Sequence, residues 1–374
     1  MIDIEKILTE GVTKGASDIH IVEGSKPIYR VNRMLIEVED VQEVNETDIL
    51  DIFEFFINDN AGLRNMFQTE KRIDLNFQIM DARLRINISS ANGIPVFTAR
   101  IIQNRLPQFN NLGLPDVVRR TASLPQGLIL VTGKSNSGKS NTLNAILNEI
   151  NHTENKKILT LENPIEYVHN SDKSLIVQKE VGEGKDCLSF SDGAINALRE
   201  DCDIVVIGEI RDKNTIDAAL ELAEAGHLVI GTMHTRSAAE TIDRILGFYD
   251  LSDQLVVKYI VSSVLKAVIT QRLINGINND LIMVPEIMIV DEVVSGLIRK
   301  EKFSKSEIED AIQTRMERGS ISFINSLANA VSAKKISLYQ AKKQLDDSGC
   351  ENLTRILGQM NERKLNFWKW KIWL

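Results

Sequence analysis

A phosphate-binding loop is the clearest chemical motif in the chain, and it runs Gly133-Lys-Ser-Asn-Ser-Gly138-Lys139-Ser140. The loop follows the apolar run 128–132 and precedes the helical pattern 141–150, which is the strand–loop–helix order that this motif requires. Backbone N–H groups of such a loop surround phosphate oxygens, and the helix N-terminus adds the positive end of its dipole. We expect Lys139 to reach the β- and γ-phosphates of ATP and Ser140 to ligate Mg²⁺. The residues predicted to hold the nucleotide are Gly133, Ser135, Asn136, Ser137, Gly138, Lys139, Ser140 and Asn141.

Two glutamates end other buried-strand patterns. Glu162 follows the run 157–161, and Glu209 follows Asp203-Ile-Val-Val-Ile-Gly, which is a Walker B pattern. Ligands of an open parallel sheet bind at the carboxyl ends of its strands. We therefore expect both carboxylates near the phosphate loop, around a shared Mg²⁺ and water site.

Two of the five histidines, His227 and His234, flank the apolar run 228–232. A lone histidine usually has a structural role. The sharper interpretation is a sensor of the γ-phosphate or a contact between subunits, and the residues alone leave both open.

The patterns of strands and helices divide the chain into four parts. Residues 1–103 alternate like a small α+β domain, and 104–113 read as a linker with Pro107 and repeated asparagines. Short continuous apolar strands alternate with helices over 114–290, which predicts an α/β domain with a parallel sheet. Residues 291–374 read as a helical C-terminal region with a Trp-rich tail.

Three local assignments can be compared directly with the fold. Pro27–Ile36 reads as one strand, and Asn92-Gly93 marks a turn between two strands. Val256–Thr270 is the most apolar stretch, but it contains Lys258 and Lys266, so we expect a buried or amphipathic helix there.

Composition argues against several classes of protein. Lys plus Arg is 44 and Asp plus Glu is 52, so the net charge is −8, which argues against a duplex-DNA binder. The three cysteines form no CxxC pair, which argues against a zinc ribbon or a disulfide framework. The acidic start is unlike a signal peptide, and no apolar run reaches the roughly 18 residues of a membrane span.

The ordered motifs resemble those of the type IV pilus retraction ATPases (PilT-like) within the type II/IV secretion ATPase family. The resemblance covers nearly the whole chain. It includes, besides the phosphate loop and Walker B, Ser17-Asp-Ile-His20, Glu162-Asn-Pro-Ile-Glu-Tyr167, Leu198-Arg-Glu-Asp201, Gly226–Thr235, Ala238–Arg244 and Gln271-Arg-Leu273.

This resemblance implies a PAS-like N-terminal domain, a RecA-like ATPase domain and a homo-hexameric ring with ATP sites between subunits. It implies that Glu162 positions or activates water and that Glu209 acts at Mg²⁺ and the γ-phosphate. His227 and His234 would sense the nucleotide. Arg85 and Arg100 of the N-terminal domain are our candidates for arginines that reach a neighbouring subunit's site; the alternative for each is a solvated strand face.

The implied function is ATP hydrolysis that powers pilus retraction. The implied location is the cytoplasm, peripheral to the inner face of the membrane, with a platform protein and other pilus machinery as partners and no nucleic acid. The tail 367–374 alternates aromatics and lysines, so it could dock on a partner or an anionic membrane, or simply be a packed or disordered end.

The chain departs from the family pattern at three places. Asn163 stands where the family has aspartate, which removes a charge beside Glu162, and Asn141 replaces a usual threonine. Val293–Lys300 reads Val-Val-Ser-Gly-Leu-Ile-Arg-Lys, where the family reads close to Ala-Ile-Arg-Asn-Leu-Ile-Arg-Glu. We still expect hydrolysis, because Lys139, Glu162 and Glu209 are present, whereas retraction is less strongly indicated.

Three alternatives stay open. One is an accessory nucleotide-binding subunit with little or no hydrolysis, which the departures favour. Another is a pilus-assembly or type II secretion ATPase, although those relatives usually carry an extra N-terminal domain and a four-cysteine zinc insert. The last is a nucleic-acid translocase on the same fold, which the negative net charge opposes.

Overall fold

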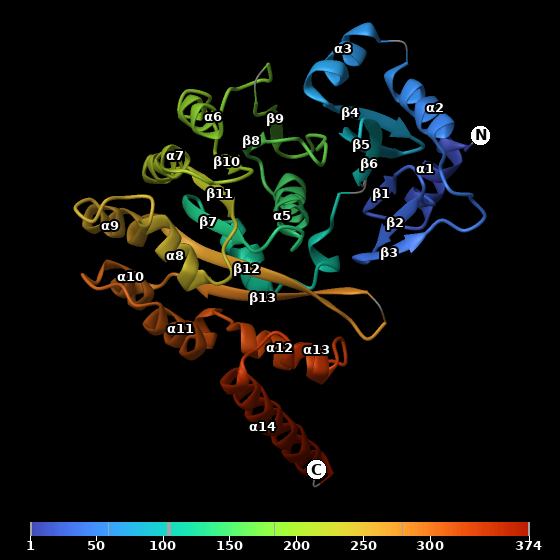
Figure 1. Ribbon diagram of the computed structural model, residues 1–374. Helices are drawn as coiled ribbons and strands as arrows, with labels where there is room; N and C mark the ends of the chain where they lie inside the picture. Colours follow the sequence, from blue (N-terminus) through green and yellow to red (C-terminus); the bar gives the residue numbers. More distant parts are fainter. Residues whose placement is uncertain (1, 59, 103–105, 183, 279, 373–374) are drawn as a thin grey trace. The chain divides into compact units, whose positions relative to one another are not determined.

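The computed structural model describes residues 2–58, 60–102, 106–182, 184–278 and 280–372, and only the backbone of 361–372. The chain forms two compact units, Met1–Arg105 and Leu106–Leu374 (Figure 1). The predicted domain boundary at residue 103 falls at 103–105, outside the described residues, and the side chains of the Trp-rich tail lie outside them as well. None of the helices in the described part of the chain is both long and apolar enough to span a bilayer.

The N-terminal unit is a six-stranded antiparallel sheet in the order β3-β2-β1-β6-β5-β4, with three helices on its apolar face. Its elements are α1 (Ile4–Thr13), β1 (Asp18–Ile21), β2 (Ile28–Val31), β3 (Met34–Glu37), α2 (Glu46–Ile57), α3 (Ala61–Glu70), β4 (Arg72–Ile79), β5 (Ala82–Ala91) and β6 (Ile94–Ile102). Apolar residues alternate along β5 and β6, so one sheet face packs on the helices and the other carries polar side chains.

The expected single strand Pro27–Ile36 is wrong, because it is a hairpin of β2 and β3. Asn32 and Arg33 both have positive φ, 49° and 69°, as a two-residue hairpin turn requires. An Asn-Arg pair is a weak signal for such a turn. The Asn92-Gly93 turn is confirmed, since both residues have positive φ between β5 and β6.

The second unit is built on a seven-stranded sheet in the order β13-β12-β7-β11-β10-β8-β9 (Figure 1). All strands are parallel except β13, which pairs antiparallel with β12. The strands are β7 (Gly127–Thr132), β8 (Lys157–Glu162), β9 (Leu175–Glu180), β10 (Ile204–Ile207), β11 (Leu228–Met233), β12 (Leu265–Asn275) and β13 (Leu281–Ile289). Every residue of β7, β10 and β11 is buried, which matches the predicted parallel sheet covered on both faces.

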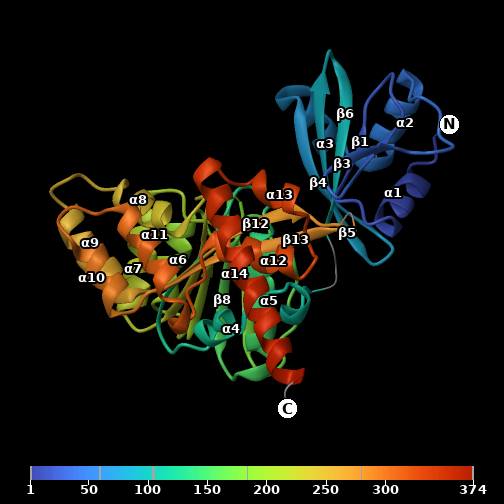
Figure 2. The same ribbon diagram turned by 90° about the horizontal axis from the view of Figure 1, so that it is seen from below.

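Helices cover the two faces of this sheet unequally (Figure 2). One face packs on η1 (Phe109–Asn111), α4 (Asp116–Ala122) and α5 (Lys139–Thr153). The other face packs on α6 (Phe190–Ala197), α7 (Lys213–Glu224), α8 (Ala238–Leu246), α9 (Gln254–Val264), α10 (Glu292–Arg299) and α11 (Lys305–Thr314). Because alternate residues of each strand face opposite helix layers, neighbouring strand residues anchor different helices.

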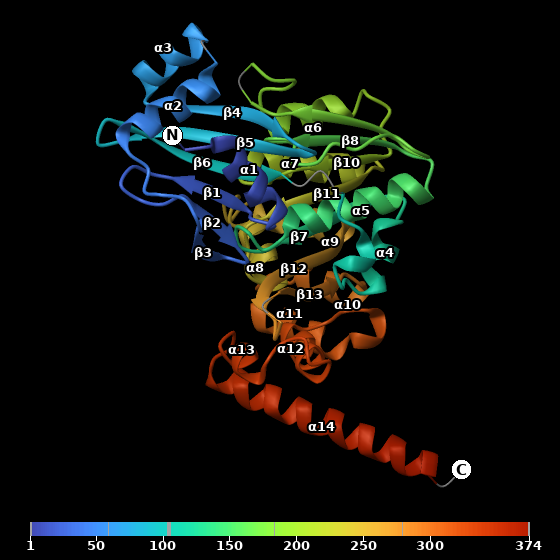
Figure 3. The same cartoon turned by 90° about the vertical axis from the view of Figure 1, so that its right-hand side faces the viewer.

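The last helices form a smaller cluster at the ends of β12 and β13. They are α12 (Phe323–Ser332), α13 (Leu338–Lys342) and the long α14 (Asp347–Ile372), with the short η2 (Met316–Arg318) before them (Figure 3). The helical C-terminal region is thus present. The predicted start of this region at residue 291 follows the last strand, β13. However, α10 and α11 come after residue 291 and still pack in the main apolar cluster of the second unit.

The expected helix Val256–Thr270 is half wrong. Helix α9 ends at Val264, and Leu265–Thr270 begins the buried strand β12 beside β7. A short continuous apolar run has no periodicity that separates a buried helix from a buried strand.

The central position of β7 generates a prediction about stability. Leu130 is fully buried on β7, so Leu130→Ala should lower the free energy of unfolding of the second unit by about 2–5 kcal/mol. The matched control is Leu251→Ala, because Leu251 is 86% exposed and its truncation should change stability by less than about 0.5 kcal/mol. Urea unfolding followed by fluorescence and circular dichroism measures both. Equal effects in the two variants would contradict this picture of the core.

Candidate nucleotide-binding and hydrolysis site

The loop between β7 and α5 has a backbone that only glycine accommodates at its two ends. Gly133 has φ +149°, and a Cβ there would lie 2.4 Å from Ser137 Oγ and 2.6 Å from Gln271 O. Gly138 has φ +88° and precedes the first residue of α5. The loop therefore closes tightly on itself, as a backbone cradle for phosphate does.

Lys139 lies at the centre of this loop. Its Nζ donates to the carbonyls of Gly133 at 3.0 Å and Lys134 at 3.1 Å. Burial lowers the pKa of Lys139, and the nearby carboxylates of Glu209 and Glu166 act in the opposite direction. The amine is thus a buried cation held over the loop, near the Walker B carboxylate of Glu209 and the carboxylate of Glu166.

Buried polar atoms without a partner point into the same loop. Among the described residues, Ser137 Oγ and Gln271 Oε1 are buried and make no hydrogen bond. Gln271 comes from β12, and its Nε2 donates to Ser137 O at 2.9 Å. The sequence had marked Gln271 only as part of a family motif; the structure shows that it braces the loop. Ser135 and Asn136 are exposed at the tip of the loop.

Glu209 lies at the carboxyl end of β10 and is contacted by two basic side chains. Arg211 binds both carboxylate oxygens of Glu209, and His234 Nε2 lies 3.0 Å from Oε1. The pKa of His234 is lowered by burial and by Lys139, and Glu209 acts in the opposite direction. The structure thus brings His234 to the Walker B carboxylate, as the sensor interpretation requires.

Glu162 ends β8, the neighbour of β10, and is more deeply buried. Its Oε1 accepts hydrogen bonds from Thr160 Oγ1 at 2.7 Å and Gln178 Nε2 at 2.9 Å. Burial raises the pKa of Glu162, although these two hydrogen bonds act against the shift. A Cβ at Gly208 would lie 2.8 Å from Leu161 O, so a glycine before Glu209 lets the two acidic strand ends approach closely.

Three amide and imidazole side chains connect Glu162 with α5, and the sequence analysis missed all three. Gln178 binds Glu162 and accepts from the backbone N–H of His169 at 2.8 Å. His169 Nε2 lies 2.6 Å from Asn144 Oδ1, and Asn144 Nδ2 donates to Ser140 O at 2.9 Å. The available signal was the spacing of Asn141, Asn144, Asn148 and Asn151 along one side of a helix.

His227 does not join this cluster within one chain. It precedes β11, where Gly127 N donates to His227 O, whereas the loop follows the other end of β7. Six strand residues at about 3.3 Å each place it roughly 20 Å from the loop. The strand that links the two histidines in sequence thus separates them in space, and a nucleotide-sensing role for His227 stays a prediction.

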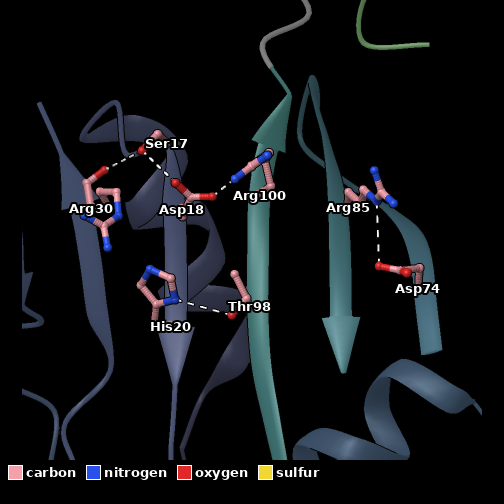
Figure 4. A network of polar contacts seen from close by, with 8 residues as sticks. All are labelled: Ser17, Asp18, His20, Arg30, Asp74, Arg85, Thr98 and Arg100. Atoms are coloured by element: carbon pink, nitrogen blue, oxygen red, sulfur yellow. Dashed lines mark hydrogen bonds and ion pairs between the residues drawn. The ribbon is translucent and has the colours of Figure 1, made fainter. Parts of the chain in front are cut away.

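The two candidate trans arginines lie on the polar face of the N-terminal sheet (Figure 4). Arg100 Nε donates to Asp18 Oδ1 at 2.9 Å, and Arg85 Nε lies 3.7 Å from Asp74 Oδ1. The two arginines are register partners on β5 and β6, and their side chains are 41% (Arg85) and 59% (Arg100) exposed. They are accessible cations, and their action on a neighbouring subunit stays a prediction.

The donor set fits ATP with Mg²⁺. The glycine cradle, Lys139 and the unpartnered Ser137 hydroxyl fit phosphate oxygens, and Ser140 and Glu209 offer the oxygen ligands that Mg²⁺ prefers. No group of three or more His, Cys, Asp or Glu side chains suited to a metal occurs in the described part of the chain.

The chain is similar to known proteins over most of its length. The type II/IV secretion system protein family matches residues 1–281. The type IV pilus retraction ATPase PilT of Pseudomonas aeruginosa is 38% identical over 318 residues, which cover 83% of this chain and 89% of that protein. A twitching motility protein of Neisseria gonorrhoeae is 35% identical over 324 residues, covering 86% and 85% respectively.

A solved structure has a similar fold. The crystal structure of the pilus retraction motor PilT with bound ADP superposes with a TM-score of 0.81 at 32% identity, covering 94% of this chain and all of that chain. The predicted fold class, an α/β RecA-like P-loop ATPase domain after a small N-terminal domain, is confirmed.

The tight loop predicts a strong effect of one methyl group. Gly133→Ala should abolish nucleotide binding, because its Cβ would overlap Ser137 Oγ and Gln271 O. Gly296→Ala on α10 is the matched control, since nothing lies within 4 Å of a Cβ there. Fluorescent ADP titration measures the dissociation constant of each. Binding by Gly133→Ala that equals wild type would contradict the cradle.

The buried imidazole of His169 predicts a loss of stability in acid. Burial lowers the pKa of His169 to about 4 from a usual value of 6.5. Its contribution is fully present above pH 6.5 and is lost as the pH falls towards 4, because only the unfolded state binds the proton in that window. By this linkage, wild type should lose about 2–3 kcal/mol more than His169→Gln between pH 7 and 4.5. Urea unfolding at both pH values tests this, and parallel losses in the two proteins would refute it.

Proposed function

The chain belongs to the type II/IV secretion system protein family, and we propose that it is the ring-forming motor that hydrolyses ATP to power retraction of a type IV pilus. It is an ATPase of this family. One observation carries the proposal: the phosphate loop, both catalytic carboxylates and His234 are assembled at one edge of the second sheet. The similarity to PilT over 83% of this chain, and to a twitching motility protein over 86% of it, supports the retraction part of the proposal.

The residues divide the chemistry among themselves. Lys139 and the loop amides bind and orient the β- and γ-phosphates. Ser140 and Glu209 would hold Mg²⁺, which would supply positive charge beside the phosphate oxygens. Glu162 accepts a proton from the attacking water. A buried carboxylate with a raised pKa is a stronger base than an exposed one, so the burial of Glu162 suits that role.

His234 is the residue that can report the state of the site. Its Nε2 contacts Glu209 and its pKa responds to Lys139, so it touches the group proposed at the metal and senses the charge proposed at the phosphates. Mg²⁺, the homo-hexameric ring, the trans arginines Arg85 and Arg100, and a cytoplasmic location against a membrane platform protein are parts of the same proposal.

The accessory alternative rests in part on Asn163, which stands where the family has aspartate. Asn163 is exposed, and the side-chain donors to Glu162 are Thr160 and Gln178. An asparagine at 163 therefore leaves the hydrogen bonds from Thr160 and Gln178 to Glu162 intact. This supports a hydrolysing ATPase over a subunit that only binds nucleotide.

Turnover by the intact chain tests the proposal. With Mg²⁺ and ATP, wild type should hydrolyse ATP as a particle of about six subunits, and Glu162→Gln and Glu209→Ala should each lower kcat by about 10²–10⁴-fold. Glu224→Gln is the matched control, because Glu224 is an exposed carboxylate on α7 outside the site. A phosphate-release assay and native mass measurement supply both readouts.

Two other outcomes have defined meanings. Tight nucleotide binding without turnover in wild type would overturn the motor in favour of the accessory subunit, and Asn163→Asp would then be the variant to restore activity. Stimulation of the rate by DNA would point instead to a nucleic-acid translocase.

A further inference from the structure

A continuous set of uncharged side chains joins the proposed base Glu162 to the helix that follows the phosphate loop. It runs from Glu162 through Gln178, across the peptide of His169 to its imidazole, and on to Asn144, whose amide reaches Ser140 O. Each contact is between 2.6 and 2.9 Å. These residues come from β8, β9, α5 and the segment between the two strands, so the set links the second acidic strand end to the loop's own helix.

Gln178 is the member with the most fixed orientation. Its Oε1 accepts from His169 N, and its Nε2 donates both to Glu162 Oε1 at 2.9 Å and to Tyr167 O at 2.8 Å. A flipped amide would set a carbonyl against two acceptors and an amine against a donor, so only one orientation satisfies all three. Gln178 is the register partner of Thr160, which donates to the same carboxylate oxygen.

The geometry also fixes the proton on His169. Asn144 donates its Nδ2 to Ser140 O, so its Oδ1 faces the imidazole and the Nε2 of His169 must donate. His169 is therefore a donor that holds its own segment against α5, and the ring is neutral at pH 7 because burial lowers its pKa to about 4. Movement of α5 at Ser140 would be passed along this set to the peptide that orients Gln178.

We propose that Gln178 is a positioning residue for hydrolysis, which holds the Glu162 carboxylate in its working orientation, and that His169 and Asn144 tie this orientation to the phosphate-loop helix. This inference rests on the proposed function, since it assigns a role in ATP turnover. Two side-chain donors converge on one carboxylate oxygen, which fixes the plane of the carboxylate. Without one of these two donors, the Glu162 carboxylate can adopt several orientations. Misplacement of a catalytic base by about 1 Å lowers the rate roughly 10²-fold.

The test compares Gln178→Met with Asn151→Ala in the full-length chain. Methionine keeps the length of glutamine without its hydrogen bonds. Asn151 is the matched control, because its amide also ties α5 to the segment after β8, through Asn170 O at 2.8 Å and Asp172 N at 3.0 Å, but it does not touch Glu162. We expect Gln178→Met to lower kcat by about 10- to 100-fold with KM and the ADP dissociation constant within about twofold, and Asn151→Ala to keep the wild-type kcat.

A second pair tests the connection to α5. His169→Leu loses the donor to Asn144, whereas His169→Gln keeps an Nε2–H at a similar reach. We expect kcat to fall about 10-fold in His169→Leu and most of that loss to be restored in His169→Gln, at equal melting temperatures within about 3 °C.

The outcomes separate this inference from the proposed function. Active wild type with Gln178→Met within about twofold of its kcat overturns the inference and leaves the motor standing. Equal losses of kcat in Gln178→Met and Asn151→Ala also overturn it, because a structural role would explain both. Wild type without turnover overturns the inference together with the proposed function.

Discussion

The parallel register of four strands is the constraint on which the whole site depends. Strand β11 pairs with β7 and β10, and β10 pairs with β8, all in parallel and without a shift in register, so their carboxyl ends stop at one edge. Every residue of these strands except Lys157 at the start of β8 is buried, and the proposed site begins one or two residues beyond the last paired residue of each strand. Because the strands are covered on both faces, this edge is where polar side chains can gather without crossing the core. The phosphate loop, Glu209, His234 and Glu162 are four consequences of the same pairing.

Burying ionisable side chains at this edge of the sheet lowers the stability of the fold unless other groups compensate for the lost hydration. Lys139 and Glu162 are buried, and burial shifts the pKa of each towards its neutral form. Neutral polar groups provide the compensating hydrogen bonds. Loop carbonyls accept from Lys139, and hydroxyl and amide groups donate to Glu162. A full ion pair would fix Glu162 as a weak base, whereas a few neutral hydrogen bonds orient it and leave its affinity for a proton high. The preference for Asn and Gln here follows from what the base must do.

The sequence predicted this edge well because its signals are local. A glycine-rich loop between a buried run and a helix, and acids at the ends of two more buried runs, each need fewer than ten residues to be seen. What it missed depends on distant pairing. Leu265–Thr270 became a strand because β7 offers it a partner, and Gln178 and His169 matter because β9 and its preceding segment return to α5. His227 shows the converse, because the sequence pattern groups it with His234. The two residues lie at opposite ends of β11, so His227 is far from the phosphate loop within one chain.

Of the three departures from the family pattern, Asn141 lies in the proposed site beside Ser140, whereas Asn163 and the segment 293–300 make none of the described contacts with Lys139, Glu162 or Glu209. Asn163 is exposed beside a base that is held by other residues. The altered segment 293–300 coincides with α10, where Val294 and Ile298 pack into the main apolar cluster and Ser295 Oγ donates to Ser262 O on α9. That helix is held by α9 and α11 rather than by the phosphate loop. A change in the sequence of α10 therefore alters none of the described contacts of the phosphate loop. The proposed hydrolysis site and an altered α10 segment are therefore compatible in one chain.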